Sequence, residues 1–233
     1  MVAGAGALVL AGAGAGARDR RPAGPAGAGT ANPSALVAAE IAFNRMVREK
    51  GQWKAFAKFA DEAAVMLVPQ PVLAQGWLQG RRDPPEHLQW EPYQVWMSCD
   101  GTLGLTTGVW QRDNGTMGTY VTIWKERDKK RDYRWVFDMG EALAQVPDKP
   151  EFLAAKVADC PAPRPWVAPV GEKASADITV TAEGPPNQGR SDDGTLKWRY
   201  VAAQDGETVL TVSVLEDGEN HDLVFRVSGS KEH

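Results

Sequence analysis

Residues 103–141 of the chain read LGLTTGVWQRDNGTMGTYVTIWKERDKKRDYRWVFDMGE. Apolar and polar residues alternate within three runs, Leu103–Arg112, Met117–Glu126 and Tyr133–Met139, and this period of two is typical of β-strands. Asn114-Gly115, between the first two runs, is a dipeptide that tight hairpin turns favour, because both central residues adopt positive φ. The stretch therefore predicts an antiparallel β-meander rich in tryptophan.

Both faces of this meander carry bulky apolar side chains. A two-residue turn at Asn114-Gly115 predicts two directly opposed pairs that share one face: Val109 with Tyr120, and Leu105 with Trp124. The opposite face would hold Trp110 and Ile123. In the third strand, strict alternation places four bulky residues on the face away from Asp138: Tyr133, Trp135, Phe137 and Met139. We expect one face to line an internal cavity and the other to meet a partner subunit or the C-terminal segment.

Two helices with apolar faces precede the meander. Asn32 is placed to cap the first helix with Pro33 at its first position, and Gly51 ends it. A second, shorter helix follows up to Asp61, with Trp53 among the residues of its apolar face. The order of elements predicts an α+β fold in which a curved antiparallel sheet wraps around the N-terminal helices as a cone-shaped barrel.

The C-terminal half has a different pattern. Pro150–Asp159 predicts a short helix, and the prolines that follow predict a stiff connector. Three strand-like runs come next: Leu196–Ala203, Thr208–Glu216 and Asp222–Val227. This small three-stranded β-meander would bury too little core to fold alone, so we expect it to pack on the first domain. The predicted divisions are residues 1–31 (leader), 32–141 (first domain), 142–175 (short helix and connector) and 176–233 (meander).

The leader resembles a secretory signal. Residues 1–17 are almost all Ala, Gly, Val and Leu, and they end in a small-residue cleavage pattern before charged Arg18-Asp19. We therefore expect a periplasmic or secreted protein, with a cytoplasmic location as the alternative. The segment is too short and too rich in glycine to predict a stable membrane span.

Charge and composition exclude some functions. The formal net charge is −4, so the chain lacks the basic surface that nucleic-acid binding requires. No nucleotide-binding motif is present, and the three histidines have no metal-ligand spacing: His87, His221 and His233. The sequence therefore predicts no cofactor and no metal.

Two cysteines, Cys99 and Cys160, are the only ones in the chain. In an oxidising compartment they could form one disulfide that closes a long loop. The alternative is a pair of buried free thiols, and spacing alone does not decide between the two.

Two segments carry a resemblance to a known superfamily. The strand ending Tyr133–Gly140, and Phe56–Met66 before it, resemble the nuclear transport factor 2-like superfamily, most of all its SnoaL-like branch of unknown function. The resemblance covers residues 32–141. It implies a deep apolar pocket, frequent dimerisation through the sheet, and roles as isomerases, dehydratases, cyclases or binding modules. Met139 stands where many relatives have a histidine after the last strand's aspartate, which removes a proton carrier.

Asp138 is the candidate catalytic carboxylate, because its apolar surroundings would raise its pKa towards that of a useful base. The alternative is a structural aspartate that accepts hydrogen bonds at the sheet. The candidate ligand-binding residues are mostly aromatic and could line a site for a flat or apolar molecule: Trp53, Met66, Tyr93, Trp96, Trp110, Tyr120, Trp124 and Trp135. For each one, core packing is the alternative.

Three functions remain open from the sequence. The first is an exported protein that binds a small apolar or aromatic molecule without transforming it. The second is an isomerase, dehydratase or cyclase with Asp138 as general base and tyrosine or tryptophan donors on a carbonyl oxygen. The third is a protein-interaction module, and a homodimer through the sheet is compatible with each.

Overall fold

The computed structural model describes residues 1, 30–127, 132–160, 186–204 and 206–228. The signal-like segment and most of the predicted connector lie outside these residues. Within them, the elements in chain order are α1 (Pro33–Lys50), α2 (Gln52–Phe59), β1 (Ala60–Leu67), β2 (Pro71–Leu73), α3 (Ala74–Leu78), β3 (Leu88–Met97), β4 (Leu103–Arg112), β5 (Met117–Arg127), β6 (Asp132–Leu143), β7 (Ala154–Val157), β8 (Gln188–Arg190), β9 (Leu196–Ala202), β10 (Thr208–Glu216) and β11 (Glu219–Val227).

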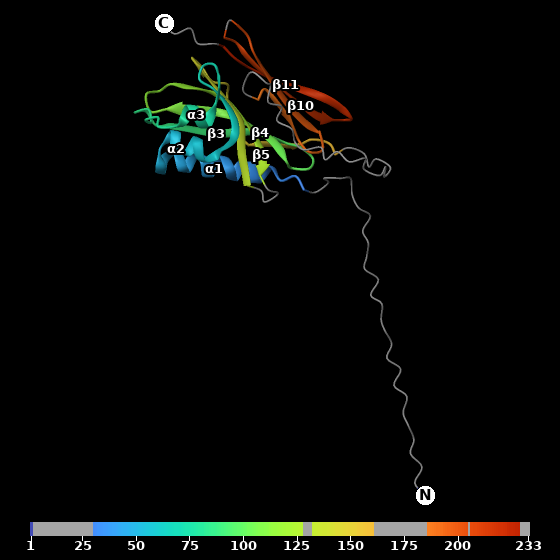
Figure 1. Ribbon diagram of the computed structural model, residues 1–233. Helices are drawn as coiled ribbons and strands as arrows, with labels where there is room; N and C mark the ends of the chain where they lie inside the picture. The colour runs from blue at the N-terminus through green and yellow to red at the C-terminus, as the bar shows by residue number, and fades with distance from the viewer. Residues whose placement is uncertain (2–29, 128–131, 161–185, 205, 229–233) are drawn as a thin grey trace.

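The strands form two sheets. The larger has seven strands in the order β2-β1-β6-β5-β4-β3-β7, and the smaller has four in the order β11-β10-β9-β8. Figure 1 shows α1 and α2 against one face of the large sheet and β10 and β11 across its other face. The predicted α+β class, with a curved sheet around N-terminal helices and a small C-terminal sheet, is confirmed. No helix in the described ranges is long and apolar enough to span a membrane.

The first helix begins and ends where the sequence predicts, although the Asn32 side chain makes no capping hydrogen bond. The second helix ends at Phe59, before the predicted limit at Asp61, because β1 already begins at Ala60. α1 runs from Pro33 to Lys50, and Gly51, at φ 97°, separates it from α2. Asp83 then caps α2, because its Oδ1 accepts the backbone N–H of Trp53 at 2.7 Å. The apolar side chains of α1 and α2 pack on the concave face of the large sheet, where Trp124 and Trp135 are fully buried.

The β4–β5 hairpin differs from the prediction by one residue. Its loop contains three residues, Asp113 to Gly115, and Gly115 alone has positive φ, at 86°. The backbone N–H of Arg112 donates to the carbonyl of Thr116 at 2.8 Å, so the loop is a turn followed by a glycine bulge. A one-residue change in register reverses the faces of one strand's side chains relative to those of its partner strand.

The predicted register of this hairpin is therefore wrong. The observed pairs are Val109 with Thr119, Leu105 with Ile123, Gly108 with Tyr120 and Gly104 with Trp124. Tyr120 and Trp124 thus lie on the concave face with Trp110, while Leu105 and Ile123 lie on the convex face.

A β-bulge in β6 corrects a second expectation. Ile123 pairs with Phe137 while Trp124 pairs with Trp135, so Val136 is an extra residue in β6. Trp135 therefore faces the helices, whereas Phe137 and Met139 face the opposite side, and the predicted common face does not exist. After the bulge, Asp138 points to the concave face.

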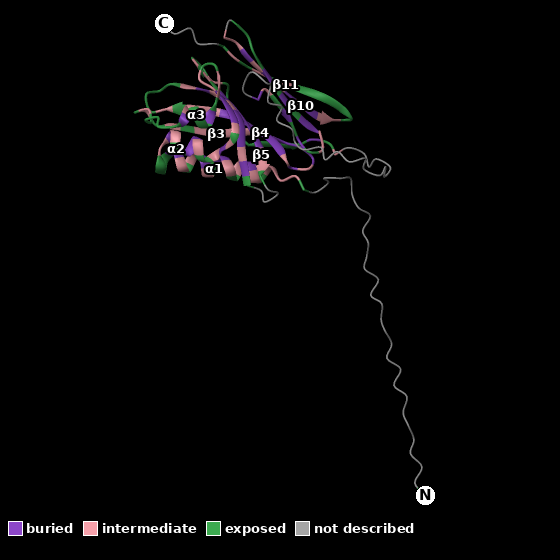
Figure 2. Ribbon diagram, viewed as in Figure 1, coloured by how far each residue is buried: buried purple, intermediate pink, exposed green. Residues whose placement is uncertain are grey.

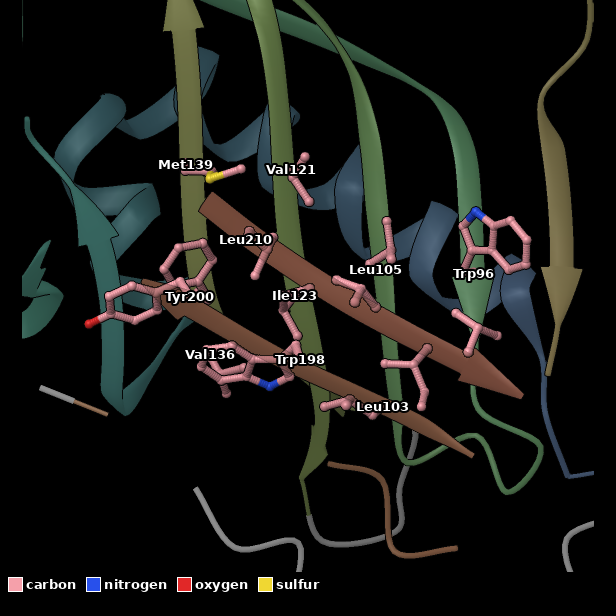
Figure 3. Packing of buried hydrophobic residues seen from close by; sticks show 14 of the residues in the cluster. Trp96, Leu103, Leu105, Val121, Ile123, Val136, Met139, Trp198, Tyr200 and Leu210 are labelled. Carbon is pink, nitrogen blue, oxygen red and sulfur yellow. The ribbon is translucent and has the colours of Figure 1, made fainter. Parts of the chain in front are cut away.

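The small sheet covers the convex face of the large one. Apolar residues of β9 and β10 meet those of β4, β5 and β6 in one buried layer (Figure 3). Phe137 stacks on Tyr200 with ring centroids 4.9 Å apart. Figure 2 shows buried residues on both sides of the large sheet and exposed ones along β11. Of the two occupants expected for this face, it is the C-terminal segment that covers it.

Residues 150–159 contain no helix. Ala154–Val157 instead forms β7, which pairs in parallel with β3 and is itself the edge strand of the large sheet. After β7, the backbone N–H of Asp159 donates to the carbonyl of Leu215 at 2.8 Å, which ties the segment to the small sheet. The segment bridges the two sheets rather than standing as a helix between them.

Two turns of nearly identical sequence hold the sheets together. Residues 98–103 read SCDGTL and residues 191–196 read SDDGTL. The third residue of each turn is an aspartate, Asp100 in the first and Asp193 in the second. One carboxylate oxygen of this aspartate accepts three hydrogen bonds: from the hydroxyl of the turn's serine, and from the backbone N–H and the hydroxyl of its threonine. The other oxygen accepts the backbone N–H of the opposite aspartate, at 2.8 Å in both directions. We call this pair of turns the aspartate clasp.

A disulfide lies beside the clasp. Cys99, inside the first turn, is bonded to Cys160, and their Cα atoms are 5.1 Å apart. The bond joins residues 61 positions apart in sequence and fixes the end of the β7 segment to the β3–β4 turn. Of the two alternatives left by the sequence, the structure contains the bond.

Candidate functional site

A cavity of about 150 Å³ lies between the helices and the concave face of the large sheet. Six of its lining residues are aromatic: Phe43, Trp53, Phe56, Trp90, Trp110 and Tyr120. The others are Gln52, Met66, Leu88, Arg112, Thr122, Asp138 and Gly140. Aromatic walls with a few polar groups are typical of small-molecule sites.

Strand register places a polar row across the concave face. Thr106 of β4 pairs with Thr122 of β5, which pairs with Asp138 of β6. The Thr122 hydroxyl donates to Asp138 Oδ2 at 2.7 Å. Burial nevertheless raises the pKa of Asp138 to about 6, and the Thr122 hydrogen bond only partly offsets it. Near neutral pH this carboxyl is therefore mostly ionised, yet close to the pH at which it takes up a proton.

Glu40, in the middle of α1, is a second buried carboxyl near this row. Its side chain is 1% exposed, and Trp90 Nε1 donates to Oε2 at 2.6 Å. Its Oε1 accepts the hydroxyl of Thr106 and, at 3.3 Å, the Nε1–H of Trp124. Burial raises the pKa of Glu40 to about 7, against the opposing effect of these donors, and the charge of Asp138 adds to the rise.

Tyr120 contributes a hydroxyl that has no partner in the described part of the chain. The residue is 7% exposed, lines the cavity, and its hydroxyl is a buried group without a hydrogen bond. Burial holds its pKa well above the ordinary value, with the charges of Glu40 and Asp138 adding to the effect. An unsatisfied buried hydroxyl is costly, and a ligand atom could satisfy it.

Among the residues that the structure describes, Arg112 is the one cationic side chain that lines the cavity. Its guanidinium donates to the carbonyl of Glu86 at 3.1 Å and to Gln52 Oε1 at 3.4 Å. Along β4 it lies six residues from Thr106, roughly 20 Å of extended strand. The cation therefore belongs to the hairpin end of the cavity and the carboxyls to the other.

The structure brings five predicted site residues to the cavity. Asp138, Trp53, Met66, Trp110 and Tyr120 all line it. Whether they bind a ligand remains a prediction.

The other four candidates do not reach the cavity lining. Trp124 and Trp135 lie on the same face but are fully buried among core residues. Tyr93 is the unpaired residue of a bulge in β3. Trp96 faces the opposite side, between the sheets, where Lys156 Nζ lies 4.4 Å from its ring centroid. The three tryptophans therefore belong to the core on one side of the sheet or the other, and Tyr93 belongs to a bulge in β3, so none of the four lines the cavity.

Sequence reasoning missed Glu40 and several wall residues. The signal for Glu40 was its spacing, four residues after Leu36 and three before Phe43, in the middle of the buried stripe of α1. A carboxyl at such a position needs hydrogen-bond donors from outside the helix. Trp90 was hidden because it lies in a loosely patterned part of β3, before the bulge.

No group of three or more metal-ligating side chains occurs within the described residues. His87 lies at the surface, where its Nδ1 is 2.7 Å from Asp113 Oδ2. The site therefore combines the Asp138 carboxyl, the Arg112 guanidinium, a tyrosine hydroxyl without a partner and aromatic walls, and the buried Glu40 carboxyl lies behind Trp90. Such a set can bind a small polar head group and can also accept or donate a proton.

No family model matches the chain, and no curated protein matches it. Solved structures do match. A protein of unknown function from the DUF3225 family of Pectobacterium atrosepticum is 10% identical, with a TM-score of 0.36, covering 48% of this chain and 91% of that chain. The beta subunit of benzoate 1,2-dioxygenase from Burkholderia mallei is 14% identical, with a TM-score of 0.37, covering 49% and 92%.

A Δ5-3-ketosteroid isomerase from Mycobacterium is 17% identical, with a TM-score of 0.34, covering 46% of this chain and 91% of that chain. The similarity concerns the fold of about half of this chain and says nothing about its activity.

Proposed function

We propose that the protein binds a small, ring-sized, largely apolar molecule in the concave cavity, with the polar end of that molecule at Asp138. The observation that carries the proposal is the Asp138 carboxyl, which lines a cavity whose other walls are mainly aromatic. Burial of a carboxyl without a charged partner costs free energy, which a bound ligand could offset. The unpartnered hydroxyl of Tyr120 adds a second group that a ligand could satisfy.

The cavity volume limits the size of the ligand. About 150 Å³ is the volume of an engineered protein cavity that binds benzene, and it is well below that of sites for drug-sized molecules. One aromatic ring or a compact aliphatic group with a short polar substituent fits this volume. A fused multi-ring molecule would require the walls to move.

Proton-transfer catalysis is the second candidate function, and the raised pKa of Asp138 favours it. A base with a pKa of about 6 is mostly ionised at neutral pH and can return the proton that it takes. Asp138 would remove a proton from the carbon beside a carbonyl and return it to another carbon of the same molecule. The Tyr120 hydroxyl would donate a hydrogen bond to the carbonyl oxygen while its negative charge develops.

Export to an oxidising compartment is part of the proposal. The Cys99–Cys160 bond supports it, because disulfides persist mainly in such compartments. The interaction-module alternative has less support, because the chain's own small sheet covers the convex face of the large sheet. A homodimer would have to use another surface.

Ligand binding can be tested with a neutral probe, benzyl alcohol, using saturation-transfer NMR and native mass spectrometry of freshly purified protein. We expect binding to the wild type and loss of binding in Leu88→Trp, which fills the cavity from its wall. Leu73→Trp is the matched control, because Leu73 is exposed on β2 and does not line this cavity. Equal binding by wild type and Leu88→Trp would contradict the proposed site.

A further inference from the structure

We propose that the cavity selects an organic cation, a small amine or quaternary ammonium with one ring-sized apolar group, through Asp138 and the surrounding aromatic rings. This inference rests on the proposed function and adds the charge of the ligand. It starts from a charge imbalance: within the described ranges, neither Asp138 nor Glu40 has a Lys, Arg or His partner at ion-pair distance.

The two carboxyls act on the same end of the cavity. Asp138 lines it directly, and Glu40 lies behind Trp90, whose Nε1–H donates to Glu40 Oε2 at 2.6 Å. Hydrogen-bond donors alone stabilise both carboxyls, namely hydroxyls and indole N–H groups. A buried carboxylate is costly without a counter-charge, and a bound cation would supply one.

The walls suit a cation as well as an apolar group. Phe43 packs edge-to-face against Phe56 and Trp90, with ring centroids 4.8 Å apart in both pairs. Trp53 adds another edge-to-face contact with Phe56, at 5.7 Å. The faces of aromatic rings attract ammonium groups, and rings arranged around a cavity are a known means of recognising quaternary ammonium.

Arg112 does not cancel this preference. Its guanidinium lies towards the hairpin end and is engaged by Glu86 and Gln52. An anionic ligand attracted to Arg112 would still have to place its apolar part beside two carboxyls. A ligand with its ammonium at Asp138 instead supplies a counter-charge to the buried carboxyls and lies away from the guanidinium.

A series of three probes isolates charge from size: benzylammonium, benzyl alcohol and benzoate share one ring and differ in the charge of the substituent. We expect the wild type at pH 7.5 to bind benzylammonium at least tenfold more tightly than benzyl alcohol, and benzoate most weakly. Isothermal titration calorimetry measures all three. Asp138→Asn should weaken benzylammonium binding at least tenfold and change benzyl alcohol binding less than threefold.

Asp132→Asn is the matched control, because Asp132 is exposed on the same strand and pairs with Arg134. It should leave all three affinities within twofold of the wild type. Equal affinities for ammonium and alcohol, or tighter binding of benzoate, would overturn the cation proposal while leaving the binding site intact. Failure of all three probes would overturn the proposed function itself. The three affinities of the wild type test the cation proposal even if Asp138→Asn does not fold.

Discussion

Asp100 and Asp193 each accept the other's backbone N–H, at 2.8 Å in both directions, and so join the two sheets by a reciprocal contact. Their two turns have nearly the same sequence and the same internal hydrogen bonds. The contact therefore has approximate two-fold symmetry within a single chain.

The clasp should contribute measurably to stability. Asp193→Asn can keep the hydrogen bonds of its own turn, but its amide NH₂ would face the N–H of Asp100 in place of an acceptor. We expect unfolding to become easier by about 2 kcal/mol, measured as a lower urea midpoint at unchanged slope. Asp192→Asn is the control, because Asp192 is exposed and only its backbone N–H contacts the other turn. Equal midpoints for the two variants would contradict a role for the clasp.

The disulfide should stabilise the protein mainly through the unfolded chain. Replacing both Cys99 and Cys160 by serine opens a loop between residues 61 positions apart. The chain-entropy relation gives a loss of about 4 kcal/mol for a loop of this length. Urea unfolding of the wild type with and without reductant, beside the double variant, measures it. The variant has no disulfide, so its urea midpoint should not change with reductant. A change would show that the reductant destabilises the protein by a route other than loss of this bond.

Protonation of Glu40 should make folding stability depend on pH. Its pKa is about 7 in the folded protein against an ordinary 4.5, so the folded state binds the proton more tightly. Its contribution is therefore most favourable below pH 4.5 and is lost as the pH rises to about 7, by about 3 kcal/mol in total.

Glu40→Gln removes this dependence, because its amide can accept from Trp90 and donate to Thr106. We expect the unfolding free energy of the variant, relative to the wild type, to rise by about 3 kcal/mol between pH 4.5 and 7.5. Glu62→Gln is the control, since the Glu62 side chain is 91% exposed. Parallel pH profiles for wild type and Glu40→Gln would contradict the prediction.

Binding of a cation should depend on the ionisation of Asp138. Its pKa of about 6 means that affinity for benzylammonium should fall as the pH is lowered from 7.5 to 5. Glu40 from α1 and Tyr120 from β5 lie near it, and Arg112 lines the same cavity. Glu40, with a pKa of about 7, also titrates in this range.

Thr122→Val removes the hydroxyl that stabilises the ionised form of Asp138. The midpoint of the pH profile for benzylammonium binding should therefore shift to higher pH. Glu40→Gln distinguishes the titration of Asp138 from that of Glu40. If Asp138 controls the affinity for benzylammonium, the pH dependence of that affinity remains in this variant. A midpoint that does not move in Thr122→Val would argue against Asp138 as the titrating group.

Local patterns in the sequence were enough to predict most elements of the fold. The spacing of apolar residues in α1, with Pro33 and Gly51 at its ends, predicts that helix. The alternation in β4, β5 and β6 predicts the meander, because a period of two reflects two distinct faces. The structure places Asp138 at the cavity wall, and its role as a base stays a prediction.

The assignment of faces failed for physical reasons. Asn114-Gly115 is compatible with loops of two or three residues, and the choice decides which residues of one strand share a face with those of the other. The extra residue Val136 has no signature, because bulges follow from sheet curvature rather than from local sequence. Trp96 was misplaced because tryptophan serves equally well in a core and in a cavity wall.

The repeated clasp turns were also missed. Six residues are too short to stand out as a repeat, and their meaning depends on contact between segments 93 positions apart. Glu40 escaped for a related reason, because its donors come from three different strands: Trp90 from β3, Thr106 from β4 and Trp124 from β5. Such groupings follow from topology and cannot be read from one segment.

The packing of β9 and β10 on β4, β5 and β6 has a consequence for biosynthesis. The apolar convex side, with Ile123 and Phe137 at its centre, has no cover until the ribosome has made the strands up to Glu216. A nascent chain that stops earlier presents an adhesive surface of the kind that chaperones recognise. Burial of this layer is thus a late step in folding, in which β9 and β10 shield the earlier strands β4, β5 and β6 from aggregation.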